Sequence, residues 1–487
     1  MSDITDLELL ISAGKNLLFV ESRDERRVEA LFQRLATRLG RQLLRWSVAS
    51  GLKSLSQEPL YHRSAMEPGK VLAEITTRTP PSIYLMMDIH HWLDDPLILR
   101  QLKEIALDKP GQTLVLVSHA AEIPDELRAV SAQFALSLPD RAELEQLLQD
   151  ESQAWGRQHQ QRVKARQEII DALITNLSGL TLSDARQLIR TAIYDDGMLT
   201  EEDLSELAKT KYQLLDPQGV LSLELDTAKF GQVAGLTHMK LWLEQRRDIF
   251  LSAQAPAGLD PPKGILLLGV QGGGKSLAAK SVAGSWGIPL LRLDFGALYN
   301  KYYGETERNL RDSLDTAETM SPCVLWIDEI EKGLSGDDEG GPSKRILGTL
   351  LTWMAERTSR VFLVATANDI EMLPPELLRK GRFDEIFFVD LPDAEVRREI
   401  FRIHLTKRGY ETEQFDLDKL QVASEGFAGA EIEQAVVSAL YASHAAQESL
   451  TTDHIKAEVA RTKPLSVLMA EKIAYLRAWA ASRTVSA

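Results

Sequence analysis

The sequence predicts an α/β protein that holds two copies of one architecture, each a parallel sheet followed by an α-helical lid. Short apolar runs alternate with helical patterns in the second half, and a weaker series in the same order precedes them. Such alternation favours a parallel sheet covered by helices on both faces. The runs are GILLLG at 264–269, LLRL at 290–293, CVLWI at 323–327, VFLVA at 361–365 and IFFV at 386–389, preceded by LLFV at 17–20, IYLMMD at 83–88 and TLVLVS at 113–118.

The two copies differ where the second carries a glycine-rich loop. Residues 269–276 read GVQGGGKS, whereas the matching residues 21–28 read ESRDERRV and contain no glycine. The acidic pair at 328–329 is matched in the first copy by Asp88 followed by an isoleucine. We therefore interpret the first copy as a degenerate domain that serves as a scaffold or binds a partner. An unrelated α/β domain with chance similarity is the alternative.

The helical lids of the two copies also contain similar sequence segments. SGLTLSDARQLIRTAI begins at Ser178, and EGFAGAEIEQAVVSAL begins at Glu425. No further strand pattern follows Asp393. The expected organisation is a degenerate α/β domain at 1–140, its helical lid at 141–213, a linker at 214–229, a second α/β domain at 230–393 and a helical lid at 394–487.

Composition is typical of a globular protein and disfavours nucleic acid as a partner. The chain has 487 residues, of which 44% are hydrophobic, and its formal net charge is −15. A negative field repels phosphate backbones and anionic membranes. No apolar run reaches the roughly 18 residues that a spanning helix requires, and the one cysteine, Cys323, has no partner for a disulfide. We expect a cytoplasmic protein of at least two domains, with no nucleic-acid or membrane partner.

The loop GVQGGGKS fits the phosphate-binding pattern G-x-x-x-x-G-K-[ST] between a predicted strand and a predicted helix. Glycines let backbone N–H groups surround a phosphate, and the helix N-terminus adds a favourable dipole. Lys275 would bind the β- and γ-phosphates of ATP, and Ser276 would ligate Mg²⁺. The sequence therefore predicts a P-loop nucleotide fold, with a glycine-rich turn and an exposed lysine as the alternative.

Two carboxylates, Asp328 and Glu329, directly follow the CVLWI run. They should lie at the carboxyl edge of the parallel sheet, where ligands of such sheets bind. Asp328 would hold Mg²⁺ through its water shell, and Glu329 would orient and polarise the attacking water. A solvated surface pair is the alternative.

These residues, together with VATAN and LLRKGRFD, resemble the AAA+ superfamily and its protein-remodelling clade from residue 230 to 443. The resemblance implies that Asn368 is a polar sensor that helps to position the water. It implies that Arg379 and Arg382 are arginine fingers that reach the γ-phosphate of a neighbouring subunit. A lone subunit would then have an incomplete site, so the resemblance implies a homo-oligomeric ring, such as a hexamer.

The resemblance also extends the nucleotide site beyond the loop. In this clade the segment that matches 232–235 lines the adenine pocket, the histidine that matches His404 lies near the sugar, and the lid residues that match Gly429 and Ala430 pack near the base. An ordinary histidine on a surface helix is the alternative for His404. The expected nucleotide contacts are Val233, Ala234, Gly235, Gly269, Val270, Gln271, Gly272, Gly273, Gly274, Lys275, Ser276, Leu277, His404, Gly429 and Ala430.

The segment KYYGE at 301–305 stands where remodelling AAA+ proteins carry a pore loop. In that interpretation Tyr302 grips a substrate chain and Tyr303 supports it. Two ordinary, partly buried tyrosines are the alternative.

Nearly the whole chain resembles one AAA+ family, known from a conserved open reading frame of algal plastids and cyanobacteria. The matching segments include ELLISAGKNLLFVESRDERRVEALF near the start and PCVLWIDEIEK, VATANDI and LPPELLRKGRFDEIFFVDLP in the second copy. Because the first copy matches as well, the resemblance is to a family and not only to the superfamily. It says little about the substrate.

Three functions are compatible with this site. We expect an AAA+ ATPase that hydrolyses ATP to ADP and phosphate with Mg²⁺, as a ring that remodels a protein partner bound through the N-terminal domain. The alternative is a nucleotide-dependent switch or assembly scaffold that threads no chain. A nucleic-acid motor is least favoured, because the chain is acidic and lacks a basic patch with interleaved aromatic residues.

Overall fold

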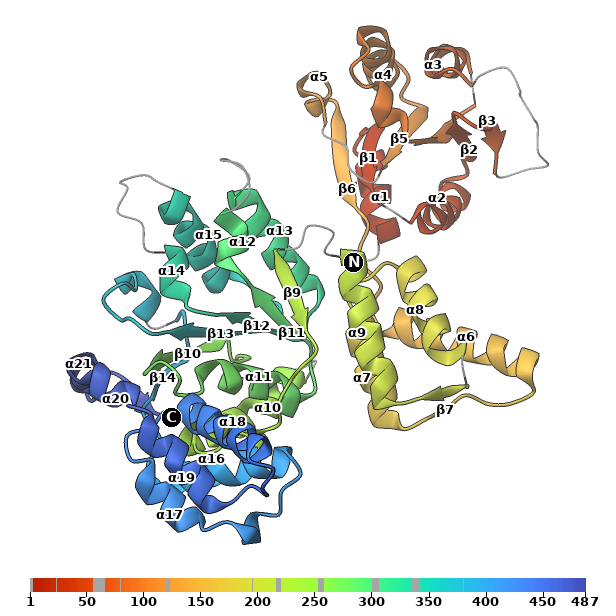
Figure 1. Ribbon diagram of the computed structural model, residues 1–487. Helices are drawn as coiled ribbons and strands as arrows, with labels where there is room; N and C mark the ends of the chain where they lie inside the picture. The colour runs from red at the N-terminus through yellow and green to blue at the C-terminus, as the bar shows by residue number, and fades with distance from the viewer. Residues whose placement is uncertain are drawn as a thin grey trace. The chain divides into compact units, whose positions relative to one another are not determined.

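The chain forms two compact units, and each contains one mainly parallel sheet (Figure 1). The computed structural model describes residues 3–22, 24–55, 66–78, 80–118, 123–194, 196–215, 220–252, 258–299, 306–334, 342–379 and 381–487. Unit 1 comprises Met1–Val163 and Leu180–Gly197, and unit 2 comprises Lys164–Gly179 and Met198–Ala487.

The sheet of unit 1 has the strand order β3-β2-β4-β5-β1-β6, with only the edge strand β3 antiparallel to its neighbour. Side chains alternate along its strands, so Leu17 and Phe19 pack in one core while Leu18 and Val20 pack in the other. Its strands are β1 Leu17–Glu21, β2 Gln42–Ser47, β3 Gly51–Ser54, β4 Ser82–Met87, β5 Gln112–Ser118 and β6 Ser131–Ala135.

Helices cover both faces of this sheet, since α1 and α2 share a core with Leu18 while α3 and α4 share a core with Leu17. Two further helices of unit 1, α6 and α8, pack against each other. The helices are α1 Asp3–Ser12, α2 Glu25–Leu39, α3 Pro68–Thr77, η1 Ile89–Trp92, α4 Pro96–Asp108, α5 Asp125–Arg128, α6 Arg141–His159 and α8 Leu182–Tyr194.

The sheet of unit 2 has the order β15-β14-β10-β13-β12-β11-β9 and repeats the central order of the first sheet. Strand β1, which leads into the first large helix of unit 1, lies between β5 and β6, and β10, which leads into the corresponding helix of unit 2, lies between β13 and β14. The two-copy α/β prediction is therefore confirmed. The strands are β9 Leu221–Glu224, β10 Gly264–Gly269, β11 Leu290–Leu293, β12 Cys323–Ile327, β13 Val361–Ala367, β14 Glu385–Val389 and β15 Val485–Ser486, with β7 Lys164–Ala165 and β8 Met198–Leu199 forming a separate pair.

The helices of unit 2 include a C-terminal lid with its own core, in which Phe401, Leu405 and Ile432 are fully buried. The helices are α7 Gln167–Leu177, α9 Glu201–Leu215, η2 Phe230–Gln232, α10 Thr237–Leu251, α11 Lys275–Trp286, α12 Phe295–Tyr299, α13 Thr306–Thr319, α14 Ile330–Leu334, α15 Pro342–Glu356, η3 Pro375–Leu378, α16 Ala394–Lys407, η4 Thr412–Gln414, α17 Leu417–Ala423, α18 Gly429–Ala445, α19 Thr452–Arg461, α20 Leu465–Leu468 and α21 Ala470–Ala480.

Three features differ from what the sequence pattern suggested. Strand β9 lies within the segment expected to be a linker, and it forms the antiparallel edge of the second sheet. The short strand β15 follows the last helix and pairs with β14, although only helices were expected after Asp393. Helix α7 groups with unit 2 because it packs on α9, whose buried Lys211 Nζ donates to the carbonyls of Asn176 and Ser178. The domain boundaries stay predictions.

Candidate active site

The turn between β10 and α11 depends on glycines that no other residue could replace without strain. Gly274 has a φ of +95°, in the left-handed region that favours glycine. At Gly269, a Cβ atom would collide with the carbonyl of Val389 on the neighbouring strand. The turn leads into α11 at Lys275, and no side chain caps this helix. Its first backbone N–H groups are therefore available to an anion.

Lys275 is 6% exposed, and its ammonium lies within the turn. Nζ donates to the carbonyl oxygens of Gly269 at 2.9 Å and Val270 at 2.8 Å. Burial lowers the pKa of Lys275 to about 8, although the carboxylates of Glu331 and Asp328 act in the opposite direction. The two carbonyl groups accept hydrogen bonds from the buried ammonium but carry no net charge to balance it. Such a site favours an anion, so the chain's own residues fit a polyphosphate here.

Two hydroxyl groups converge on the Asp328 carboxylate. Thr366 Oγ1 donates to Oδ1 at 2.6 Å, and Ser276 Oγ donates to the same oxygen at 3.4 Å. Thr366 Oγ1 also accepts a hydrogen bond from the backbone N–H of Glu329 at 2.9 Å. Carboxylate and hydroxyl oxygens are hard ligands of the kind that Mg²⁺ prefers. Ser276 and Asp328 therefore fit the metal role predicted for them.

The Glu329 carboxylate is held by two partners. Asn368 Nδ2 donates to Oε1 at 2.7 Å, and Lys332 Nζ pairs with Oε2. The backbone of Glu329 has a φ of +49°, which is uncommon outside glycine. Such conformations cost about 1–3 kcal/mol and cluster at functional sites. The two groups predicted to handle the attacking water are thus in direct contact.

Sequence reasoning assigned no role to Thr366 and Glu331, which contact the predicted catalytic residues. Glu331 is 3% exposed, and burial raises the pKa of its carboxyl group. Its Oε1 accepts from the backbone N–H of Asn368 at 2.9 Å, while Oε2 is buried with no partner among the described residues. Strand register could have indicated Thr366, because Ile327 lies opposite Ala365 and the next residues are therefore neighbours.

One cavity of about 330 Å³ lies between the glycine-rich turn, the sheet edge and the C-terminal lid, and Glu331 is not among the residues that line it. Of the predicted nucleotide contacts, Gly235, Gly269 and Val270 do not line it, and a Cβ at Gly235 would lie 3.1 Å from the Val396 side chain. The lining residues are Gln232, Val233, Ala234, Leu236, Gln271, Gly272, Gly273, Gly274, Lys275, Ser276, Leu277, Asp328, Glu329, Thr366, Asn368, Ile400, Ile403, His404, Gly429, Ala430 and Glu433.

The lid contributes both a backbone contact and a histidine to this cavity. The N–H of Ala430 at the start of α18 donates to the carbonyl of Gly272 at 3.4 Å. His404 Nδ1 lies 3.4 Å from Glu433 Oε1, with Arg408 beside both. Burial lowers the pKa of His404 below its usual value, although the Glu433 carboxylate acts in the opposite direction.

The predicted arginine fingers do not reach this cavity within one subunit. Arg382 Nη1 donates to the carbonyl of Leu351, and Arg379 is exposed after η3. Neither residue lines the cavity. Tyr302 and Tyr303, the predicted pore residues, lie outside the described residues.

Strand order, a glycine-rich turn with a buried lysine, and carboxylates at the end of β12 together define an AAA ATPase. Residues 265–391 match the family model described as ATPase family associated with various cellular activities (AAA). Residues 3–136 match the N-terminal domain, and residues 142–218 the second domain, of SpoVK-like AAA ATPases.

Whole-chain comparisons narrow the class to one family. The chain is 34% identical to the "uncharacterized AAA domain-containing protein ycf46" of Trieres chinensis, over 98% of this chain and 96% of that protein. It is 34% identical to the protein of the same name from Guillardia theta, over 99% and 96% respectively. The chain therefore belongs to the ycf46 family of AAA domain-containing proteins, as the sequence resemblance predicted.

A third relative matches the ATPase half alone. The "ATP-dependent zinc metalloprotease FtsH 3" of Synechocystis sp. is 35% identical over 42% of this chain and 34% of its own length. Within the described residues, no helix combines the length and apolar character needed to traverse a lipid bilayer. The expected cytoplasmic location stays a prediction.

Proposed function

We propose that the chain hydrolyses ATP to ADP and phosphate with Mg²⁺ at the cavity around Lys275. One observation carries this proposal: a single cavity brings together the buried ammonium, the Ser276–Asp328 pair and the Glu329–Asn368 pair. Membership of the AAA ATPase family supports it.

Each group has a distinct role in this proposal. Lys275 Nζ would leave its two carbonyl partners and bind oxygens of the β- and γ-phosphates. Ser276 and Asp328 would hold Mg²⁺, which would neutralise charge on these phosphates. The Glu329 carboxylate would accept a proton from water as its oxygen attacks the γ-phosphorus and the bond to the β–γ bridging oxygen breaks. Asn368 would keep that carboxylate oriented.

The active form in this proposal is a homo-oligomeric ring, such as a hexamer, that remodels a protein bound through the N-terminal domain. Arg379 and Arg382 would complete the site of the neighbouring subunit, which agrees with their absence from the cavity of their own subunit. Arginines supplied in this way can raise hydrolysis rates by roughly 10³-fold or more.

Turnover measured against protein concentration tests both parts. Wild-type turnover per subunit should rise with concentration, while Glu329→Gln should bind ATP and hydrolyse it at least about 100-fold more slowly. Arg379→Ala should assemble normally but lose most turnover. A rate per subunit that is constant with concentration and unchanged in Arg379→Ala would exclude a site shared between subunits.

A nucleotide-dependent switch is the second candidate, and the glycine-free loop of the first copy favours it, because only one copy has the residues for hydrolysis. Replacing Tyr302 and Tyr303 with alanine separates the two functions. A remodelling motor should lose partner processing while it keeps ATPase activity, whereas a switch should lose neither.

A further inference from the structure

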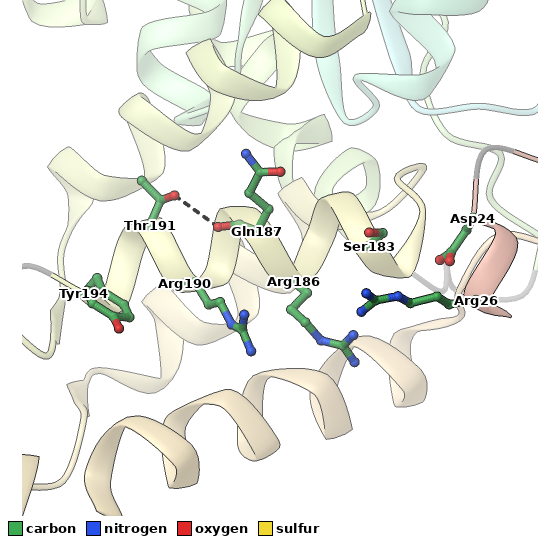
Figure 2. A pocket seen from close by; sticks show the side chains of 8 residues that line it. All are labelled: Asp24, Arg26, Ser183, Arg186, Gln187, Arg190, Thr191 and Tyr194. Carbon is green, nitrogen blue, oxygen red and sulfur yellow. Dashed lines mark hydrogen bonds between the residues drawn. The ribbon is translucent and has the colours of Figure 1, made fainter. Parts of the chain in front are cut away.

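The first copy has a cavity of its own at the place that corresponds to the candidate ATP site. It measures about 620 Å³ and lies within unit 1 (Figure 2). Asp24 and Arg26 line it at the start of α2, and Ser183, Arg186, Arg190 and Tyr194 line it from α8.

The correspondence with the ATP cavity holds at four positions. When ESRDERRV is matched to GVQGGGKS, Asp24 and Arg26 take the places of Gly272 and Gly274. When the two lid segments are matched from Ser178 and Glu425, Ser183 and Arg186 take the places of Ala430 and Glu433. All eight of these residues line their respective cavities. The degenerate copy thus keeps the hollow between strand turn and lid helix, with different chemistry.

Its chemistry is cationic in a chain that is strongly acidic. Arg186 and Arg190 are one helical turn apart, and their Nε atoms lie 3.0 Å and 2.7 Å from the two oxygens of Glu151 on α6. The Glu151 side chain is 11% exposed, and its one carboxylate pairs with both guanidinium groups. Arg26 forms no hydrogen bond or ion pair with the described residues, and Figure 2 shows its side chain extended toward α8.

Asp24 is the one carboxylate among the described residues that line the cavity, and it is already engaged. Its Oδ1 accepts from the backbone N–H of Arg27 at 3.2 Å and caps α2. Among the described residues that line the cavity there are thus three arginines and one carboxylate, and Glu151 pairs with two of these arginines. Planar guanidinium groups bind phosphate oxygens through paired N–H donors, and they do so better than lysine.

We propose that this cavity binds a small molecule that carries two or more phosphate groups, and that it does so without Mg²⁺. Val28 stands where the second copy has Ser276, so the hydroxyl ligand for the metal is missing. The arginine side chains replace the backbone N–H groups of a glycine-rich turn as phosphate donors. A small molecule is favoured over a protein partner because these groups line a hollow of ligand size.

The phosphates could belong to a nucleotide or to a molecule without a base. Tyr194 follows Arg190 by one helical turn along the same side of α8 and is 58% exposed. A ring at this position could stack on a base beyond the phosphates. This proposal is independent of the proposed hydrolysis, because it concerns the other copy.

Calorimetric titration of the full chain with pyrophosphate, ADP and ATP in EDTA tests the proposal. A Lys275→Ala background removes the contribution of the second copy. Binding should occur below about 1 mM, and Arg26→Ala should weaken it by about tenfold or more. Arg26→Ala leaves no carboxylate unpaired, and its thermal unfolding should match that of the parent.

Two further variants sharpen the result. Glu151→Gln should tighten binding by about two- to fivefold, because it frees two guanidinium groups. Arg100→Ala, which removes an exposed arginine paired with Glu104 outside the cavity, should leave binding unchanged. Equal binding of pyrophosphate and nucleotides would indicate a ligand without a base. Tighter nucleotide binding that Tyr194→Ala abolishes would indicate a nucleotide. Absence of binding, or binding indifferent to Arg26→Ala and Glu151→Gln, would overturn the proposal.

Discussion

The two copies share a strand order but begin their first large helix differently. In the first copy, Asp24 caps α2 by accepting the N–H of Arg27. In the second, α11 follows Gly274 and has no side-chain cap. A helix whose N-terminal donors are occupied by its own carboxylate cannot offer them to phosphate. The Asp24 cap withholds the N–H of Arg27 from a phosphate, and the first copy also lacks the glycines of the turn, so its sequence cannot present a P-loop.

The two copies also differ in the hydrogen bonds of a hydroxyl residue near the end of a central strand, β13 in unit 2 and β5 in unit 1. Thr366 at the end of β13 connects Asp328 with the backbone of Glu329. Its counterpart on β5, Ser118, is a buried hydroxyl with no hydrogen-bond partner among the described residues. The hydroxyl persists in the first copy while the network around it is gone. The apolar cores that hold both sheets together do not require that network.

The largest expected difference concerns the lysine and its counterpart. Lys275→Ala should weaken ATP binding by at least about 100-fold, because the buried ammonium is the main cation in the cavity. Arg27 occupies the matching position in the first copy, but it donates to the carbonyl of Ser137 and pairs with Glu143. Arg27→Ala should leave ATP affinity at the second copy unchanged. Titration of both variants with ATP and Mg²⁺ measures the difference.

Equal loss of ATP affinity in Lys275→Ala and Arg27→Ala would contradict the difference between the copies, because it would mean that the first copy contributes to the ATP site. A circular dichroism spectrum and a thermal melt of each variant show whether either has simply failed to fold.

The sequence predicted the fold best where the apolar runs were long and uninterrupted. The runs GILLLG and CVLWI predicted buried central strands, and the loop between the first of these and α11 was placed correctly. The role of Glu331 could not be predicted, because its burial depends on how α14 packs beside β13. Strand β15 was missed because two residues are too few to show a period of two.

The cavity in the first copy was also beyond the sequence pattern. Loss of the glycines removes the motif that indicates a nucleotide site, and the residues that line the cavity are separated by more than 150 positions. From the sequence alone, Arg186 and Arg190 indicate an ordinary charged face of a helix. The structure shows that both pair with Glu151. Only three-dimensional placement joins them with Arg26.

A smaller effect on turnover is expected from removing the hydroxyl groups of Thr366 and of its counterpart Ser118. Thr366→Val removes one donor to the Asp328 carboxylate and an acceptor for the Glu329 N–H, so turnover should fall by about 10- to 100-fold with ATP affinity changed less. Thr366→Ser should restore most of it. Ser118→Ala, the matched change in the first copy, should leave turnover and stability nearly unchanged, because the hydroxyl has no partner to lose.

Steady-state kinetics and thermal unfolding of the three variants measure this prediction. A purely structural role for Thr366 would lower the unfolding temperature without changing turnover per folded subunit, and that result would contradict it.

The smallest expected effect is a pH dependence that only the second copy should have. Burial lowers the pKa of Lys275 to about 8, and ATP binds the protonated form. The free protein therefore loses its binding-competent form as pH rises through 8, and ATP affinity should fall by about tenfold between pH 7 and pH 9. Near pH 8, binding should take up about half a proton, which calorimetry in buffers of different ionisation enthalpy detects. Lys275→Arg keeps its charge throughout this range, like the arginine of the first copy, and should bind ATP with no such pH dependence. If Lys275→Arg showed the same fall in affinity, another group would be responsible and the lysine would not be the titrating contact.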